Sequence, residues 1–158
     1  MASNGWAPIS EISLVAMELK QPISLEYRQA PCKPLVLVVD DDETHQKLLQ
    51  LLADRLEITV HPASSCAEAM EALRLFSFDL ILMDYRMPEV DGCACTQRIR
   101  AMNELGSNIP IIAVTAYATA DCRRRCLQSG MDDFLGKPFT VEELHERLRF
   151  WLRRRQSA

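Results

Sequence analysis

Apolar and polar positions alternate in blocks along the 158-residue chain from residue 35 onward. Residues 35–39 (LVLVV) form an unbroken apolar run rich in β-branched side chains, a pattern typical of a strand buried on both faces. Four later runs have a similar character, and we predict a strand at each of them. The five predicted strands cover residues 35–39, 58–61, 79–83, 110–114 and 133–135.

Segments with helical periodicity separate these strands and follow the last one. Ser65 with Glu68 three residues later has the sequence of a capping box, and Thr140 is an N-cap followed by acidic residues. Gly130 is the expected stop residue of the preceding helix. The predicted helices cover residues 43–56, 65–76, 93–102, 118–129 and 140–154, and the first places leucines 48, 49, 51, 52 and 56 on one face.

Strand and helix thus alternate five times, which predicts an α/β domain with a five-stranded parallel sheet and helices on both faces. We expect this domain to span residues 34–154, with 1–33 as an N-terminal extension or linker and 155–158 as a tail. In an open α/β sheet, the ligand site lies at the carboxyl ends of the strands. Functional residues should therefore follow the predicted strands directly.

Four of the five predicted strands are followed by polar side chains suited to metal and phosphate chemistry. These side chains are Asp40 and Asp41, then Asp84, Thr115 and Lys137. Three carboxylates close together raise one another's pKa and stay ionised together only if a cation joins them. Oxygen ligands with room for water and phosphate suit Mg²⁺. One carboxylate can then attack phosphorus, while the metal and a lysine neutralise the phosphoryl oxygens.

Composition and charge narrow the function further. The net charge of −4 gives no reason to expect nucleic-acid binding. No run of about 20 apolar residues is present to span a membrane. The first 30 residues also lack the basic-then-apolar order of a signal peptide. We therefore expect a cytoplasmic protein that makes no membrane contact.

The six cysteines include two close pairs, which invites a zinc or disulfide interpretation. One pair is too tight for the usual zinc spacing, and the other is one helical turn apart. Without a secretory signal, we expect reduced thiols that pack as small apolar side chains. The cysteines are Cys32, Cys66, Cys93, Cys95, Cys122 and Cys126.

Four short motifs accompany the predicted strands. They are residues 37–41 (LVVDD), 82–88 (LMDYRMP) with 91–92 (DG), 112–116 (IAVTA) and 136–139 (GKPF). Any one of them is weak, but all four in this order are highly specific. Over about residues 34–154 the chain resembles the receiver domain of two-component response regulators. The resemblance implies a flavodoxin-like (βα)5 fold with strand order 2-1-3-4-5.

The resemblance also implies a metal site and a phosphoacceptor. Asp84 matches the aspartate that is phosphorylated in this family. Asp40 and Asp41 match the acidic pair that binds Mg²⁺ (or Mn²⁺) directly or through water. Arg86 matches the position that supplies a backbone carbonyl to the metal. Asp42, in contrast, is expected to cap the following helix.

Other positions match residues that respond to phosphorylation or set its lifetime. Thr115 matches the switch hydroxyl, and Lys137 the lysine that binds the phosphoryl group. Phe134 stands at the switch-aromatic position, where a ring without a phenol can still rotate into a pocket. Arg86 and Tyr117 border the path of attacking water, and we predict that these bulky side chains slow the loss of phosphate.

Partners follow from the same resemblance. The phosphoryl group would come from a phosphohistidine of a sensor histidine kinase or a histidine phosphotransfer protein. Phosphorylation would change the face formed by residues 118–129, 133–135 and 140–154, where a downstream protein or a second copy of the chain binds. Few residues follow the last predicted helix, so no DNA-binding output is expected.

The context of the domain is open between a stand-alone receiver and part of a longer kinase. Residues 130–138 resemble receivers attached to hybrid sensor kinases. In the N-terminal extension, residues 17–23 bear a short likeness to the kinase H-box. The alternative is an amphipathic extension that packs on the domain or on a partner, and short motifs of this kind match often by chance.

Two other functions remain as alternatives. Residues 40–44 (DDDET) fit the D-x-D-x-T motif of haloacid-dehalogenase-type phosphohydrolases, with Asp40 as nucleophile, Asp42 as acid/base and residues 132–133 as a late acidic pair. That function leaves Asp84 without a role. The second alternative is a phosphorylation-independent interaction module.

The run of arginines at 123–125 is a separate feature. We expect these side chains to face solvent, as most charge runs do. The alternative is that they belong to an interface and shape partner choice there.

Overall fold

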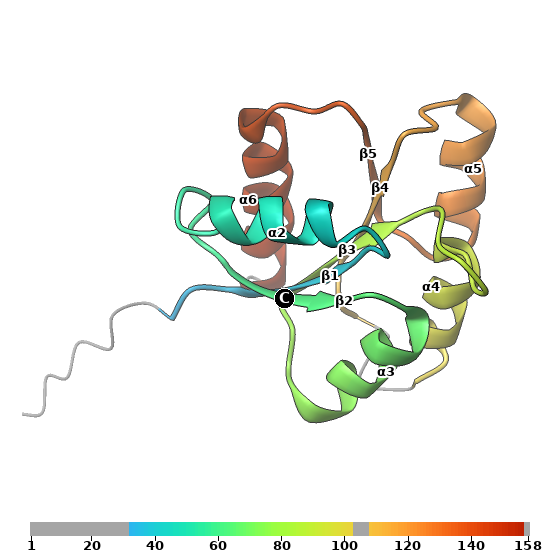
Figure 1. Ribbon diagram of the computed structural model, residues 1–158, viewed down its shortest axis with the longest axis horizontal. Helices are drawn as coiled ribbons and strands as arrows, with labels where there is room; N and C mark the ends of the chain where they lie inside the picture. The colour runs from blue at the N-terminus through green and yellow to red at the C-terminus, as the bar shows by residue number, and fades with distance from the viewer. Residues whose placement is uncertain (1–31, 103–107, 157–158) are drawn as a thin grey trace, which may run out of the picture. The chain divides into compact units, whose positions relative to one another are not determined.

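The computed structural model describes residues 32–102 and 108–156 (Figure 1). Predictions for residues 1–31, including the likeness at 17–23, lie outside the described residues. The strands are β1 Leu35–Val39, β2 Thr59–Ala63, β3 Leu80–Asp84, β4 Ile111–Thr115 and β5 Asp133–Gly136. The helices are α2 Glu43–Leu52, α3 Cys66–Leu75, α4 Gly92–Arg100, α5 Ala120–Gln128 and α6 Val141–Gln156.

The five strands form one parallel sheet in the order β2-β1-β3-β4-β5. This order confirms the predicted flavodoxin-like (βα)5 fold. The strand order reverses between β1 and β3, so their carboxyl ends lie side by side and leave a crevice above them. Asp40 follows β1 and Asp84 ends β3, which places both carboxylates at that crevice.

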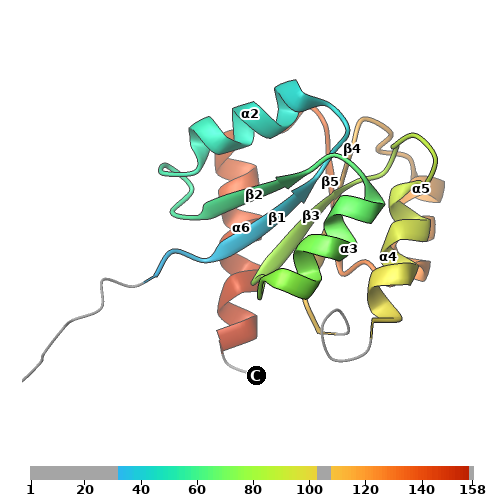
Figure 2. The same ribbon diagram turned by 60° about the horizontal axis from the view of Figure 1, so that its bottom comes forward.

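Helices cover both faces of the sheet, as Figures 1 and 2 show. One face packs against α3, α4 and α5, and the other against α2 and α6. Alternate strand residues therefore point into two separate cores: Leu37 and Met83 enter the first, and Val38 and Leu82 enter the second. All four side chains are at most 2% exposed, which explains why the strands are apolar at every position.

Each of the five described helices begins with a side chain that accepts a hydrogen bond from a backbone N–H two or three residues later. The five capping residues are Asp42, Ser65, Asp91, Thr119 and Thr140. Caps of this kind satisfy backbone donors that the helix leaves unpaired, and each contributes about 1 kcal/mol. The capping role predicted for Asp42 is therefore confirmed.

The first helix is shorter than predicted. We expected it to reach Leu56, but α2 ends at Leu52. The backbone of Glu57 is left-handed at φ 56°, and it reverses the chain so that Ile58 N–H can bond the Ala53 carbonyl oxygen at 3.0 Å. The predicted single leucine face is also wrong, because Leu48 and Leu51 of α2 are 52% and 82% exposed.

Several strand and helix ends differ from prediction by one or two residues. Asp84 and Thr115 are the last residues of β3 and β4 instead of following them. β2 runs on through Pro62, which an edge strand tolerates because its outer side needs no N–H donor. The last helix continues past Arg154 to Gln156, and Arg155 donates a hydrogen bond to the Phe78 carbonyl oxygen.

All six cysteines are free thiols. Four of them, Cys66, Cys95, Cys122 and Cys126, are buried in the core beneath α3, α4 and α5. Burial raises the thiol pKa at Cys95, Cys122 and Cys126, which leaves those thiols protonated and unreactive. None of the helices in the described part of the chain is both long and apolar enough to cross a bilayer.

Candidate functional site

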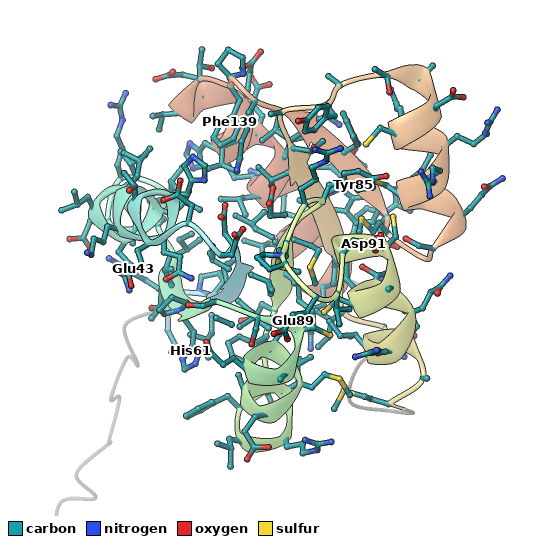
Figure 3. All side chains as sticks on the ribbon, turned by 45° about the vertical axis from the view of Figure 1, so that its right-hand side comes forward. Glu43, His61, Tyr85, Glu89, Asp91 and Phe139 are labelled. Carbon is teal, nitrogen blue, oxygen red and sulfur yellow. The ribbon has the colours of Figure 1, made fainter. Side chains whose placement is uncertain are left out.

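The predicted site residues gather at the carboxyl edge of the sheet. In Figure 3 the strand ends face the viewer, between α2, marked by Glu43, and the loop after β3, marked by Tyr85 and Glu89. Strand direction places Asp84 and Thr115 at this edge, because each is the last residue of a parallel strand. The loops that leave β1 and β5 add the remaining charged groups.

Three carboxylates form a compact acidic group at this edge. One oxygen from each of Asp40, Asp41 and Asp84 lies within 4.8 Å of the others. Asp40 is buried, Asp84 is half-buried and Asp41 is exposed. Burial raises the pKa of Asp84, and the charges of Asp40 and Asp41 raise it further, against the opposing effect of Lys137. A cation at the group would relieve this repulsion, so the three carboxylates fit a divalent metal.

The orientation of Asp40 is fixed by the start of α2. One carboxylate oxygen, Oδ1, accepts a 2.9 Å hydrogen bond from Asp42 N–H. The Asp40 carbonyl oxygen accepts a 2.6 Å hydrogen bond from the Gln46 side chain. The backbone N–H of Asp40 donates to the Ala63 carbonyl oxygen at 3.1 Å. The chain turn after β1 thus holds the buried carboxylate in one position, with Oδ2 directed at the other groups of the site.

Lys137 brings a positive charge to the same carboxylates. Its ammonium lies 3.1 Å from Asp40 Oδ2 and 3.5 Å from Asp84 Oδ1. The backbone N–H of Lys137 donates to the Thr115 carbonyl oxygen at 2.7 Å, and the bond to Pro138 is cis. The lysine is 20% exposed, so its ion pairs are less screened than those of a surface lysine.

The loop after β3 folds back tightly over Asp84. A Cβ on Gly92 would stand 2.2 Å from the Asp84 carbonyl oxygen, so only glycine fits there. Gly92 N–H also donates to the Tyr85 carbonyl oxygen at 3.0 Å, and Asp91 caps α4. The Asp-Gly pair of the sequence motif therefore closes the loop that carries Arg86.

Thr115 and Phe134, the two predicted switch residues, lie on adjacent strands. Thr115 is 1% exposed, and its hydroxyl oxygen accepts a 3.1 Å hydrogen bond from Tyr117 N–H. The Phe134 ring is partly buried against the core beneath α3, α4 and α5. Its Cε1 lies 3.9 Å from the point where a Cβ on Gly136 would stand.

Arg86 and Tyr117 join the loop after β3 to the loop after β4. The Arg86 side chain donates a 3.1 Å hydrogen bond to the Tyr117 phenol oxygen, and its guanidinium carbon lies 4.3 Å from the ring centroid. Both side chains are exposed. The two residues that we expected to border the path of attacking water therefore contact each other.

His45 is a site residue that none of the sequence motifs singles out. Its Nδ1 lies 3.1 Å from Asp40 Oδ2 and 3.2 Å from the Lys137 ammonium. The available signal was its place in the first turn of the helix that follows the acidic pair. His61, on edge strand β2, packs instead against Phe76 and Phe78.

The proposed late acidic pair of a phosphohydrolase lies at the wrong end of the sheet. Asp132 accepts hydrogen bonds from Arg100 and from the N–H of Ile111, the first residue of β4, both at 2.8 Å. Asp133, the first residue of β5, accepts from Arg147 and from the Trp151 indole. Both acids serve structural contacts at the amino edge, so the haloacid-dehalogenase alternative loses its acidic pair.

The arginines at 124 and 125 on α5 make different contacts. Arg124 pairs with Asp121 one turn earlier at 3.0 Å, which is an ordinary solvent-exposed helix pair. Arg125 instead lines a pocket of about 450 Å³ with Tyr85, Arg86 and Asp91. This side chain is thus close to the loop after Asp84, while the run as a whole remains exposed.

The chain matches the family model described as response regulator receiver domain over residues 36–149. The sensor histidine kinase RcsC of Escherichia coli (strain K12) is 38% identical over 123 residues, which are 76% of this chain and 12% of that protein. The sensor protein GacS of Pseudomonas syringae pv. syringae is 39% identical over 120 residues, which are 75% of this chain and 13% of that protein. The chain thus spans about an eighth of the length of these curated relatives.

Solved structures of similar domains agree. The receiver domain of a sensor histidine kinase from Pseudomonas aeruginosa PAO1, with a magnesium ion coordinated in its active site cleft, has a TM-score of 0.70 and 36% identity. The matched region covers 77% of this chain and 98% of that one. The receiver domain of the Francisella response regulator 1452 has a TM-score of 0.70 and 30% identity, with the same coverage of both chains.

Proposed function

The chain belongs to the response regulator receiver domain family of two-component signalling, and we propose that it accepts a phosphoryl group on Asp84 in a Mg²⁺-dependent reaction. The donor is a phosphohistidine of a sensor histidine kinase or a histidine phosphotransfer protein. The observation that carries this proposal is the position of Asp84. One of its carboxylate oxygens lies within 4.8 Å of an oxygen of Asp40 and of an oxygen of Asp41. Its Oδ1 lies 3.5 Å from the Lys137 ammonium.

The transfer step is a displacement at phosphorus. An oxygen of the Asp84 carboxylate attacks, the O–P bond forms as the P–N bond of the donor breaks, and the imidazole leaves with the electron pair. Asp84 is half-buried at the end of β3, so its carboxylate is held by the strand and not by a mobile loop. The attacking oxygen is therefore positioned before the donor arrives, which removes entropy from the barrier.

Asp41, Asp40 and Asp84 would hold the metal, with the Arg86 backbone carbonyl as a further oxygen ligand. The bound Mg²⁺ supplies positive charge to the oxygens of the transferring group. Magnesium suits this set because every proposed ligand is an oxygen, and Mn²⁺ accepts similar ligands. The exposed Asp41 leaves one side of the group open to solvent and to the incoming phosphoryl group.

Thr115 and Lys137 are proposed to respond to the phosphoryl group. The Lys137 ammonium would move from Asp40 to a phosphoryl oxygen, and the Thr115 hydroxyl would donate to another. Because Tyr117 N–H donates to the Thr115 hydroxyl oxygen, a shift of Thr115 moves the loop that carries Tyr117. The Phe134 ring lies beside Gly136, which pairs with Thr115 on the adjacent strand. We expect this ring to change position when Thr115 shifts.

The change would reach partners through α5, β5 and α6. We place the downstream protein partner, or a second copy of the chain, on this face. We also propose that the protein works in the cytoplasm, without a membrane or DNA contact of its own. Residues 34–154 would form the receiver, with 1–33 as extension or linker; the 155–158 segment predicted as a tail begins within α6, which continues to Gln156. The similarity to RcsC and GacS favours a receiver that operates beside a histidine kinase.

A phosphorylation assay tests the proposal. The protein is incubated with phosphoramidate or acetyl phosphate and Mg²⁺, and intact mass is measured for the wild type, Asp84→Asn and Asp42→Asn. We expect one added phosphoryl group on the wild type and on Asp42→Asn, because the Asp42 side chain caps α2 and an asparagine can cap it too. Asp84→Asn should gain none. A wild type that gains no mass with small donors or candidate kinases would indicate a phosphorylation-independent interaction module instead.

A further inference from the structure

Helix α6 carries a row of exposed side chains on the side that points away from the sheet. Its inner side is formed by leucines at four-residue spacing that are at most 9% exposed, namely Leu144, Leu148 and Leu152. Because an α-helix turns once in 3.6 residues, Glu146, Phe150 and Arg154 lie on the opposite side. All three are exposed, and Phe150 is 50% exposed. This outer row of α6 thus runs from an acid through an aromatic ring to a base.

The two charges of the outer row cannot neutralise each other within one copy of the chain. Glu146 and Arg154 are eight positions apart, which is about 12 Å along a helix. Neither side chain has an ion-pair partner in the part of the chain that the structure describes. The Arg154 guanidinium lies over the rings of Phe150 and Trp151, 5.3 and 5.5 Å from their centroids. Each end of the row therefore offers one unpaired charge.

The aromatic centre of the row is held in place from β5. The rings of Phe150 and Trp151 pack edge to face, with their centroids 5.3 Å apart. The Trp151 indole donates to Asp133 Oδ2 at 2.8 Å, and Arg147 pairs with both oxygens of Asp133. A ring that is already held loses little conformational freedom when a partner covers it. Asp133, in contrast, has its oxygens engaged within one copy, which leaves the outer row for contact.

We propose that the outer row of α6 is a self-association surface, on which a second copy of this chain packs its own α6 in the antiparallel direction. A two-fold axis at Phe150 places the two Phe150 rings against each other. The same axis places Glu146 of each copy opposite Arg154 of the other. A parallel arrangement would set acid against acid and base against base. The row is thus complementary to itself, which favours a second copy over an unrelated protein.

This inference rests on the proposed function for its choice of face, and it decides between the two occupants named there. Arg147 lies beside the row, but its charge is compensated by Asp133 in the same copy. Helix α6 has 16 residues and is about 24 Å long. Two helices of this length bury less than the roughly 1,200 Å² of a stable interface, so we expect a weak dimer with a dissociation constant of about 100 µM.

Sedimentation equilibrium of the full 158-residue chain measures this association. The protein is studied from about 10 to 500 µM, a range that brackets the expected dissociation constant. Metal and phosphoryl donors are left out, and a reducing agent prevents disulfides through the exposed Cys32. Phe150→Ser should weaken the dimer by about tenfold or more, because it removes the central contact. Phe76→Ser is the matched control, since Phe76 is 48% exposed at the end of α3 and should leave the dimer unchanged.

Charge exchange tests the antiparallel arrangement. Glu146→Arg gives a row with a base at both ends, and Arg154→Glu gives a row with an acid at both ends. Each variant alone should form a dimer about fivefold weaker than the wild type, because both charge pairs become repulsive. An equimolar mixture of the two should form mixed dimers at least as tight as the wild-type dimer. The control exchange is Glu71→Arg with Arg74→Glu, an exposed ion pair on α3, and it should have no effect.

The outcomes separate the possible failures. A wild type that stays monomeric over the whole concentration range overturns the inference. A dimer that Phe150→Ser leaves unchanged also overturns it, because the association then uses another surface. Mixed dimers no tighter than those of the single variants overturn the antiparallel pairing. None of these measurements needs a phosphoryl donor, so a wild type that is never phosphorylated overturns the proposed phosphoacceptor function and leaves the self-association standing.

Discussion

The Arg86 guanidinium lies over the Tyr117 ring, 4.3 Å from its centroid, and donates a 3.1 Å hydrogen bond to the Tyr117 phenol oxygen. The contact joins the loop after β3 to the loop after β4, beside the proposed phosphoacceptor. We predict that these two side chains border the path of the water that hydrolyses an aspartyl phosphate on Asp84.

We therefore expect the double variant Arg86→Asn, Tyr117→Ala to lose its phosphoryl group faster than the wild type. An exposed cation–π contact contributes up to about 1 kcal/mol, which corresponds to roughly a fivefold faster rate if the pair must open. The measurement is the decay of phosphorylated protein after removal of the donor. Tyr117→Phe keeps the ring and should decay at nearly the wild-type rate, and equal or slower decay in the double variant would refute the prediction.

The raised pKa of Asp84 predicts a pH-dependent stability in metal-free protein. Between the ordinary value near 3.8 and the raised folded value, the folded state holds more protons than the unfolded state. The free energy of unfolding should therefore fall as pH rises through this window. The cause is burial of a charge that Asp40 and Asp41 repel.

Asp84→Asn removes this charge and should be more stable than the wild type at neutral pH. Denaturant unfolding in EDTA at several pH values measures the difference. The two proteins should converge below the ordinary pKa. A wild type that becomes more stable than Asp84→Asn as pH rises would show that the Lys137 ion pair outweighs burial.

Metal binding should stabilise the fold through the same carboxylates. A ligand that binds only the folded state at about 100 times its dissociation constant adds about 2.7 kcal/mol. We expect Mg²⁺ to raise the thermal midpoint of the wild type and of Asp42→Asn, but much less in Asp41→Asn. The two variants remove the same charge from adjacent residues, so a similar response in both would show that the metal binds elsewhere.

Asp133 is predicted to be a stability residue at the opposite edge of the sheet. Its side chain is 12% exposed and accepts from Arg147 at 2.9 and 3.0 Å and from the Trp151 indole at 2.8 Å. Asp133→Ala leaves that indole N–H without its partner, and we expect a loss of about 1–2 kcal/mol in the free energy of unfolding.

Urea unfolding followed by tryptophan fluorescence measures this loss and also reports on the surroundings of Trp151. Asp121→Ala is the control, because the Asp121–Arg124 pair is exposed and should contribute less than about 0.5 kcal/mol. Similar losses in both variants would mean that the contacts of Asp133 are no more stabilising than a surface pair.

Much of the fold and most of the site follow from local sequence. Apolar runs such as residues 35–39 identify strands buried on both faces, and alternation with helices implies a parallel sheet. Because the carboxyl ends of parallel strands meet at one edge, Asp40, Asp84 and Lys137 could be expected together before any coordinates. The cap at Asp42 followed from its position alone.

Only the tertiary structure decided which side chains meet across elements. The side of α2 that faces the sheet determines that Leu48 and Leu51 are exposed and that His45 reaches Asp40 and Lys137. The contact of Arg86 with Tyr117 joins loops 31 residues apart. Local sequence sets where a helix begins, but its rotation against the sheet and the path of each loop depend on the packing of the whole core, which no short pattern contains.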